Sequence, residues 1–267
     1  MGELLTSLGS GTAQRHRTRP HRTRPHRASV ALLVAVLLSA TGCALPADLA
    51  DPSLPSPRSA PSPTRPAGTP AAALDALAVK GRAPLTGYDR DRFGQAWADV
   101  DRNGCDTRND VLRRDLTDLQ LKDGTNGCKV LAGTAAPDPY TGVDVRFVYG
   151  GPSEIDVDHV VALGNAWQTG AERWPEGTRL AFANDPLNLL AVQASANRQK
   201  GDGDAATWLP PHRAYRCAYV ARQTAVKRKY GLWVTAAERA AIARVLAGCP
   251  STRLPTGDAP TTAPGRP

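Results

Sequence analysis

The sequence predicts one α+β domain, and three features of the chain lead to this prediction. Strand-like runs at residues 129–133 and 143–149 are separated by turn residues, and helical spacing covers much of the chain from Arg213 onward. Both ends are rich in Pro, Ser, Thr and Ala, which supply little that could pack into a core. The foldable part is therefore residues 78–250, which is long enough for one hydrophobic core.

The N-terminus has the composition of an export signal. A basic run over residues 15–27 precedes an apolar run over residues 28–40 that is too short to span a bilayer. Residues 40–43 resemble a lipobox, in which Cys43 would carry lipid. Cleavage by an ordinary signal peptidase is the alternative, because a larger aliphatic residue is usual at the first position. We expect residues 1–42 to be a signal peptide and the protein to be extracellular or attached to the cell envelope.

Two proline-rich segments flank the predicted domain. Residues 43–77 have a proline at nearly every third or fourth position, and residues 251–267 have a similar composition. Such segments bury too little apolar surface to fold and behave as semi-rigid spacers. We expect a disordered linker before the domain and a disordered tail after it.

The formal charge of +8 is concentrated toward the C-terminal end of the predicted domain as well as in the N-terminal run. Residues 205–249 contain eight Lys or Arg and a single acid, Glu238. A basic segment of this kind can contact the DNA backbone with little sequence specificity, and a solvated helix face explains it equally well. The candidates for backbone contact are Arg222, Lys227, Arg228 and Lys229.

An acidic loop near the start of the domain partly matches a calcium-binding loop. The matching residues are Asp99, Asp101, Asn103, Gly104 and Asp110. An Asp stands where a bidentate Glu is usual, however, and a cysteine and two arginines interrupt the loop. The sequence therefore favours a turn fixed by a disulfide over a calcium site.

Four cysteines in the domain of an exported protein predict two disulfides. Two helices are expected at residues 213–229 and 235–247, and their short connection makes them antiparallel. Cys217 and Cys249 then lie at the same end of this hairpin, which predicts the pairs Cys217–Cys249 and Cys105–Cys128. A zinc site with four cysteines is the alternative, and no closely spaced Cys pair supports it.

The candidate functional residues lie in the middle of the chain. An extended segment ends in Asp158-His159, Asn188 opens a second apolar run, and Asn197 and Lys200 follow on a short helix. This ordered set, together with the segments Asp-His-Val-Val-Ala-Leu-Gly-Asn-Ala-Trp and Lys-Gly-Asp-Gly-Asp, resembles the HNH endonuclease domain at the C-terminus of GmrSD-type restriction endonucleases. The resemblance implies a ββα-metal core within a disulfide-stapled domain that ends in a helical hairpin.

The resemblance also implies roles for these residues. His159 would be the general base that activates water, and Asp158 with Asn197 would hold one divalent cation. Asn197 stands where the usual motif has a His, and its amide oxygen favours Mg²⁺, with Mn²⁺ as a substitute. Asn188 would fix the orientation of His159.

Three further residues surround this set. Asp156 lies two residues before Asp158 on the same face of the strand, as a second ligand or as a residue that orients a ligand. Lys200 and Arg198 are candidates for binding phosphate. The expected function is that of a secreted or lipid-anchored, monomeric endonuclease that cleaves DNA, with RNA as a further candidate substrate. The alternative is an exported nucleic-acid- or calcium-binding module that kept the fold without the chemistry.

Overall fold

The computed structural model of the chain describes residues 68–152 and 154–263. The predicted signal peptide, its Cys43 and most of the linker lie outside the described residues. All of the described residues belong to one compact unit. No helix in the described part of the chain is both long and apolar enough to cross a membrane.

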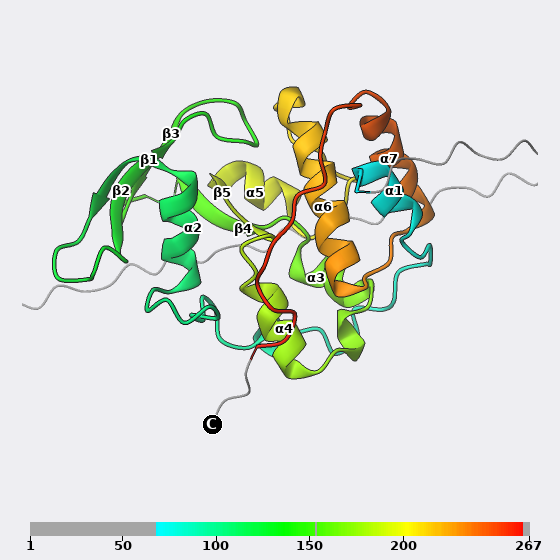
Figure 1. Cartoon of the computed structure of the whole chain (residues 1–267), viewed down its shortest axis with the longest axis horizontal. Coiled ribbons are helices and arrows are strands. Elements are labelled where there is room, and N and C mark those ends of the chain that lie inside the picture. Colours follow the sequence, from blue (N-terminus) through cyan, green and yellow to red (C-terminus); the bar gives the residue numbers. More distant parts are fainter. Residues whose placement is uncertain (1–67, 153, 264–267) are drawn as a thin grey trace, which may run out of the picture. The chain divides into compact units, whose positions relative to one another are not determined.

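Two antiparallel sheets form the β part of this mixed α/β domain (Figure 1). The larger sheet contains β1 (Thr117–Leu121), β2 (Val130–Ala135) and β3 (Val145–Val148) in that order. The smaller sheet pairs β4 (Ile155–His159) with β5 (Leu189–Gln193). The two strand-like runs expected from sequence correspond to β2 and β3, which pair with each other.

Helices surround the smaller sheet and extend the domain on its far side from β1–β3 (Figure 1). The α-helices of the described residues are α1 (Pro70–Asp75), α2 (Thr107–Asp115), α3 (Leu163–Gln168), α4 (Glu176–Ala183), α5 (Ala194–Lys200), α6 (Arg216–Tyr230) and α7 (Ala236–Ala247). Short 3-10 helices are η1 (Arg90–Phe93), η2 (Ala171–Arg173) and η3 (Arg213–Tyr215).

Strand β5 lies between two hydrophobic clusters because apolar side chains occupy both of its faces. Leu189 and Ala191 pack toward α2 and the larger sheet, whereas Leu190 and Val192 pack toward α6 and α7. A strand buried on both faces reads as a continuous apolar run rather than an alternating one. Packing on both faces therefore holds β5 in place, and α5 follows directly after it.

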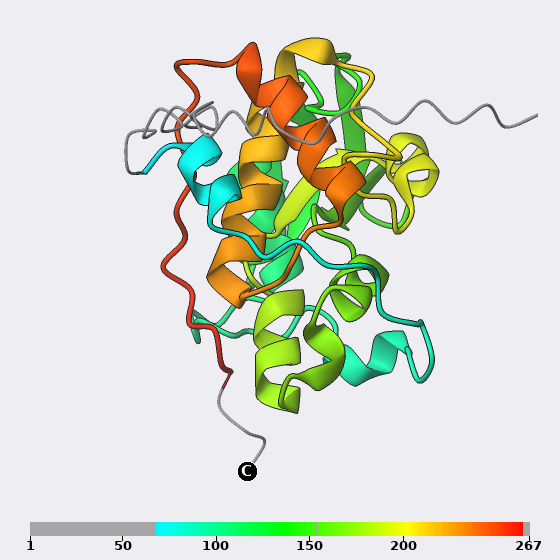
Figure 2. The same cartoon turned by 90° about the vertical axis from the view of Figure 1, so that its right-hand side faces the viewer.

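The C-terminal helices form the hairpin that the sequence predicts, as Figure 2 shows. Gly231 ends α6 with a left-handed φ of 65°, and the Thr235 side chain and Glu238 form a capping box at the start of α7. The disulfides are Cys217–Cys249 and Cys105–Cys128. Both predicted pairs are confirmed.

The packed part of the chain is longer than the predicted range of 78–250. Before it, Thr69 caps α1 and Leu74 is buried against α6 and α7. After it, residues 251–263 run along the surface, where Leu254 packs against the second core cluster and Ala263 donates a backbone hydrogen bond to Gly177. Proline-rich composition led us to expect disorder in both places, yet a few apolar residues suffice to attach these segments.

The acidic loop forms a turn next to a disulfide. The amide side chain of Asn103 donates hydrogen bonds to Asp101 and Asp110, and the backbone NH of Gly104 donates to Asp99 over 2.9 Å. Cys105 then links this turn to the end of the β1–β2 connection. The loop's carboxylates thus bond to groups of the loop itself.

Candidate active site

Strand β4 and helix α5 bring the predicted site residues together. Asp158 pairs with Leu190 and His159 with Leu189 in the β4–β5 ladder, and α5 begins directly after β5. Gly201, with a positive φ of 50°, ends α5. Because β4 and α5 pack against each other, residues about forty positions apart in the chain become neighbours.

Asn188 holds the backbone that follows His159. Its Oδ1 accepts a hydrogen bond from the Val161 NH over 2.8 Å, and its Nδ2 donates to the Val161 carbonyl over 3.2 Å. The Asn188 carbonyl also accepts from the NH of Val160. Asn188 is fully buried, so that these bonds are shielded from water. This geometry agrees with the expected role of fixing the segment next to the imidazole.

His159 is buried and held in one tautomer. Its Nε2 lies 2.8 Å from the Ala183 carbonyl oxygen, which can only accept, so Nε2 carries the proton and Nδ1 is the basic nitrogen. The Trp97 ring lies nearly parallel to the imidazole at a centroid distance of 6.3 Å. Burial lowers the pKa of His159 to about 3, and the positive charges of Arg90 and Lys200 act in the same direction. The imidazole is therefore neutral at pH 7.

Asp158 is the centre of a buried polar cluster. Its Oδ1 accepts a hydrogen bond from the Lys200 ammonium over 2.9 Å, and its Oδ2 accepts from the Tyr140 hydroxyl over 2.5 Å. Lys200 also donates to the His159 carbonyl over 2.9 Å. Burial raises the pKa of Asp158, and the Lys200 charge offsets part of this effect. The carboxylate is thus held rigidly from two sides.

Asn197 is oriented by Asp156. The Asn197 Nδ2 donates to Asp156 Oδ2 over 3.1 Å, whereas its Oδ1 accepts no hydrogen bond from the described residues. Arg198 lies near the same carboxylate, with 3.7 Å between its guanidinium and Oδ2, and 63% of its side chain is exposed. Asp156 therefore contacts the side chain of Asn197, and its two expected roles, as a second ligand or as a residue that orients a ligand, stay predictions.

One cavity of about 230 Å³ is shared by the residues predicted to carry the chemistry. Asp158, His159 and Asn197 all line it, together with Arg198. The lining thus brings a neutral imidazole, a carboxylate and an amide to the same space.

Several residues of the site were not predicted from the sequence. Tyr88 and Arg90 line the same cavity, although they come from the segment before α2. Trp97 stacks near His159 and Tyr140 bonds to Asp158. Their approach depends on packing over long sequence separations, and no local pattern in the chain marks them.

The position of Lys200 differs from our expectation. Its side chain is fully buried and paired with Asp158, so it supports the carboxylate and does not reach into solvent to meet a phosphate. The one-turn spacing from Asn197 placed the two residues on one helix face but did not reveal how deeply Lys200 lies. Arg198, which is exposed beside the cavity, remains available for contact with an anion.

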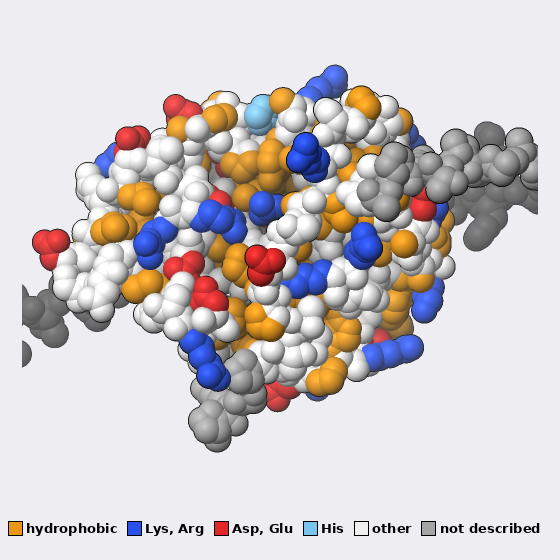
Figure 3. Space-filling model, in the orientation of Figure 1, with side chains coloured by type: hydrophobic (Ala, Val, Ile, Leu, Met, Phe, Trp, Pro, Cys, Tyr) orange, Lys and Arg blue, Asp and Glu red, His pale blue; other side chains and the backbone are white. Residues whose placement is uncertain are grey.

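The predicted basic face of the helical hairpin is also largely absent. Lys227 is buried and pairs with Glu238 over 2.8 Å, and Lys229 bonds to Asp185 over 2.6 Å. Arg222 donates to the Leu189 carbonyl, which leaves Arg228 as the exposed member of the four. On the face in Figure 3, Lys and Arg side chains are interspersed with acidic and apolar ones. Counting charges along the helix overestimated the basic surface.

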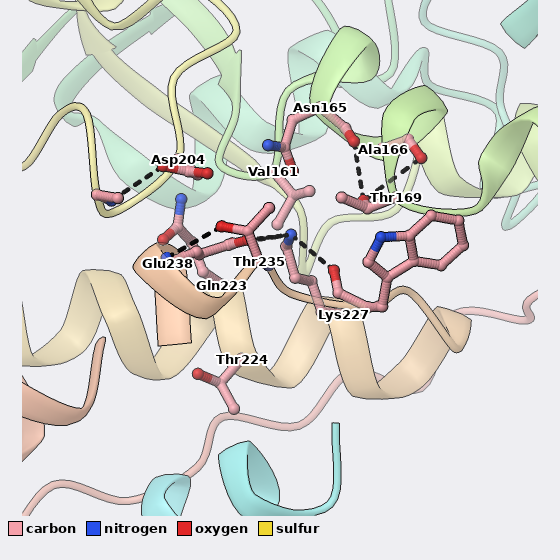
Figure 4. Close-up of polar contacts among 12 residues, drawn as sticks. Val161, Asn165, Ala166, Thr169, Asp204, Gln223, Thr224, Lys227, Thr235 and Glu238 are labelled. Carbon is pink, nitrogen blue, oxygen red and sulfur yellow. Dashed lines mark hydrogen bonds and ion pairs between the residues drawn. The ribbon is translucent and has the colours of Figure 1, made fainter. Parts of the chain in front are cut away.

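The Lys227–Glu238 pair belongs to a second buried polar network (Figure 4). Lys227 also donates to the Trp233 carbonyl, and the neighbouring Gln223 donates its Nε2 hydrogen to the Val160 carbonyl. Burial lowers the pKa of Lys227 and raises the pKa of Glu238, while the attraction between them opposes both shifts. Gln223, one turn before Lys227 on α6, supports the backbone next to His159 through its own bond to Val160.

A hard divalent cation is the group that the family resemblance implies for this cavity, and the described residues offer two oxygen ligands for it. No group of three or more His, Cys, Asp or Glu within the described ranges converges as a metal cluster. Asp158 and Asn197 would therefore be the protein ligands, and the unpartnered Oδ1 of Asn197 suits this role. Two oxygen ligands with the remaining positions left to water and substrate are typical of Mg²⁺ sites.

Comparison with known proteins gives the family of this chain. Residues 106–245 match the family "GmrSD restriction endonucleases, C-terminal domain". The chain belongs to this family. The matched residues contain β4, β5 and α5 with all of the predicted site, whereas Tyr88, Arg90 and Trp97 precede them.

A fungal relative extends the similarity beyond the family match. An "Uncharacterized secreted protein" of Arthroderma benhamiae (strain ATCC MYA-4681 / CBS 112371) is 38% identical over 218 residues, which cover 81% of this chain and 98% of the relative. No solved structure matches the chain. The similarity therefore covers nearly the whole relative, including parts outside the family match.

Proposed function

We propose that the protein is a secreted or lipid-anchored, metal-dependent endonuclease of the HNH type that hydrolyses phosphodiester bonds in DNA, with RNA as a second candidate substrate. The observation that carries the proposal is that Asp158, His159 and Asn197 line one cavity, in which the neutral imidazole has its Nδ1 free to accept a proton. Membership in a family of restriction endonuclease domains supports nuclease chemistry.

His159 would serve as the general base. Its Nδ1 takes a proton from water while the water oxygen forms a bond to phosphorus, and the bond between phosphorus and the leaving sugar oxygen breaks. A solvent water then protonates that leaving oxygen. The hydrogen bond from Nε2 to the Ala183 carbonyl keeps the ring oriented and stabilises the imidazolium that forms.

Asp158 and Asn197 would hold the cation. Mg²⁺, or Mn²⁺ in its place, would neutralise the negative charge that develops on the phosphate and the leaving oxygen. Lys200 and Tyr140 keep Asp158 in place, and Asp156 turns the amide oxygen of Asn197 away from its own carboxylate. Such supporting contacts change metal affinity by about 10- to 100-fold in other sites.

Export of the protein is supported by two further observations. The fungal relative is described as secreted, and the domain contains two disulfides. Disulfides persist in oxidising compartments outside the cytoplasm. Attachment through Cys43 and a monomeric state are further parts of the proposal. Mass analysis of the exported protein tests the lipid on Cys43, and size-exclusion chromatography tests the monomeric state.

A binding module without catalysis is the second candidate, and one observation favours it. Both carboxylate oxygens of Asp158 already accept hydrogen bonds, from Lys200 and from Tyr140. A cation would have to share these oxygens with two strong donors. A site in which the pairing holds Asp158 away from metal would bind nucleic acid and leave it intact.

Plasmid cleavage separates the two candidates. The purified protein should nick supercoiled DNA with Mg²⁺ or Mn²⁺ and stop when EDTA is added. Replacing the base, His159→Ala, should slow cleavage by about 10²- to 10⁴-fold. His212→Ala is the matched control, because His212 is half-buried and lies outside the cavity. If the wild type is inert with every metal, or His159→Ala cleaves as fast as the control, the enzyme proposal is wrong.

A further inference from the structure

A second cavity shares Arg90, His159 and Leu163 with the lining of the first. It has a volume of about 90 Å³, and its lining is mainly apolar, with Phe93, Trp97, Leu163 and Ala183. His159 lines both this cavity and the larger one. A space of this size suits one flat ring rather than a length of polymer.

Arg90 also lines both cavities. Its side chain is exposed, and no hydrogen bond or ion pair joins its guanidinium to another residue of the described ranges. The linings also include the acids Asp91 and Asp202, so neither cavity is uniformly positive. Arg90 is thus a cation free to meet an anion at the point where the two cavities adjoin.

The backbone of Trp97 provides a second indication of a functional role. Its φ of 60° lies in the left-handed region, which bulky residues rarely adopt. Such a conformation costs on the order of 1–3 kcal/mol and is found preferentially at functional sites. It places the Trp97 ring nearly parallel to the His159 imidazole, with an interplanar angle of 14°.

We propose that Arg90 and Trp97 form a nucleotide subsite: Arg90 binds the phosphodiester group entering the catalytic cavity, and the second cavity takes the nucleobase next to it. A guanidinium matches phosphate oxygens with two parallel hydrogen bonds, and an aromatic ring offers a stacking surface to any base. A base can enter only when it is unpaired. The substrate class is therefore single-stranded or locally unpaired nucleic acid.

This inference rests on the proposed function for the identity of the polymer, but it concerns different residues. Arg90 and Trp97 precede the part of the chain that matches the nuclease family. The segment before α2 would thus add nucleotide binding to a site whose catalytic residues lie on β4 and α5. The contribution of this segment to binding can be measured without cleavage.

Binding is tested with a fluorescently labelled single-stranded oligothymidylate in EDTA, which prevents metal-dependent cleavage. Arg90→Ala should weaken binding by about 10- to 100-fold, because a charge-assisted contact is lost. Arg92→Ala is the matched control, since Arg92 lies on the same 3-10 helix but over the Trp167 ring. Its affinity should stay within about twofold of the wild type.

The base-binding cavity is tested in the same assay. Trp97→Ala should weaken binding by about 5- to 100-fold, and Trp97→Phe, which keeps an aromatic face, should recover most of the affinity. Thermal unfolding of each variant verifies that it is folded. A competing duplex of the same length should bind more weakly to the wild type, and this preference should disappear in Trp97→Ala.

The outcomes distinguish this subsite from the proposed function. Equal affinities of Arg90→Ala and Arg92→Ala would overturn the subsite, even if the wild type cleaves plasmid DNA. A normal affinity of Trp97→Ala would overturn the placement of the base. Arg90-dependent and Trp97-dependent binding by a wild type that cleaves nothing would uphold the subsite and overturn the nuclease.

Discussion

Two buried lysine–carboxylate pairs in this domain look alike but have different surroundings. Lys200 lies 2.9 Å from Asp158, and Lys227 lies 2.8 Å from Glu238, with all four side chains almost completely buried. The first pair contacts the candidate-site cavity through Asp158, whereas the second lies between α6 and α7. Burial and distance are therefore nearly the same in the two pairs, and access to a cavity is the structural difference between them.

The hairpin pair should show the larger effect on stability. Lys227→Met leaves Glu238 buried without its partner, which should cost about 3–5 kcal/mol of unfolding free energy in urea denaturation. The double variant Lys227→Met/Glu238→Leu should recover most of this loss, because no charge is left buried. Retention of full stability by the single variant would contradict the pairing.

The cavity pair should respond to metal. Lys200→Met should lower the free energy of unfolding by about 2–4 kcal/mol. This loss is smaller than in the hairpin pair, because Asp158 keeps the Tyr140 hydrogen bond and reaches the cavity. Millimolar Mg²⁺ should restore part of that loss by supplying a positive charge beside Asp158. The melting temperature of Lys227→Met should not respond to Mg²⁺ in this way. Equal responses of the two variants would remove the distinction between the pairs.

The buried imidazole should make stability depend on pH. His159 has a pKa of about 3 when folded and about 6.5 when unfolded, so between these values the unfolded chain binds one more proton. The free energy of unfolding should therefore fall as the pH drops from 6.5 toward 3, by at most about 1.4 kcal/mol per unit from this group. Urea denaturation of His159→Ala should lack this contribution, and identical slopes in both proteins would argue against a buried neutral imidazole.

The smallest effect is expected at the exposed end of the hairpin. Arg228→Ala should reduce the slope of log binding constant against log salt concentration by about one at most. It should change the free energy of unfolding by no more than about 0.5 kcal/mol. Lys229→Ala should instead lower stability, because Lys229 bonds to the buried Asp185. Binding titrations at several salt concentrations and urea denaturation measure the two effects separately.

Much of the fold could be predicted because its signals are local. The capping box at Thr235 and the glycine at 231 delimit the helical hairpin, and the geometry of that hairpin determines which cysteines pair. The Asp158-His159 strand, Asn188 and Asn197 could be recognised because this part of the chain resembles a known family, which residues 106–245 match. Asp158, His159 and Asn197 converge on one cavity because β4 pairs with β5 and α5 follows β5 directly.

The features that could not be predicted depend on how deeply individual side chains are buried, which the spacing of residues along a helix does not reveal. Lys200 and Lys227 look like ordinary basic helix residues in the sequence, and only their packing against Asp158 and Glu238 identifies them as buried partners. Arg90 reaches the cavity across a separation of about seventy residues from His159. No local pattern encodes an approach of that kind.

Calorimetric titration with Mn²⁺ tests the central claim most directly, because it asks whether Asp158 and Asn197 share one cation independently of cleavage. His159→Ala should bind Mn²⁺ about as tightly as the wild type, since the base is not a ligand. Asn197→Ala, with its fold verified by circular dichroism, should bind at least about tenfold more weakly. Equal Mn²⁺ affinity of Asn197→Ala and the wild type would contradict the account.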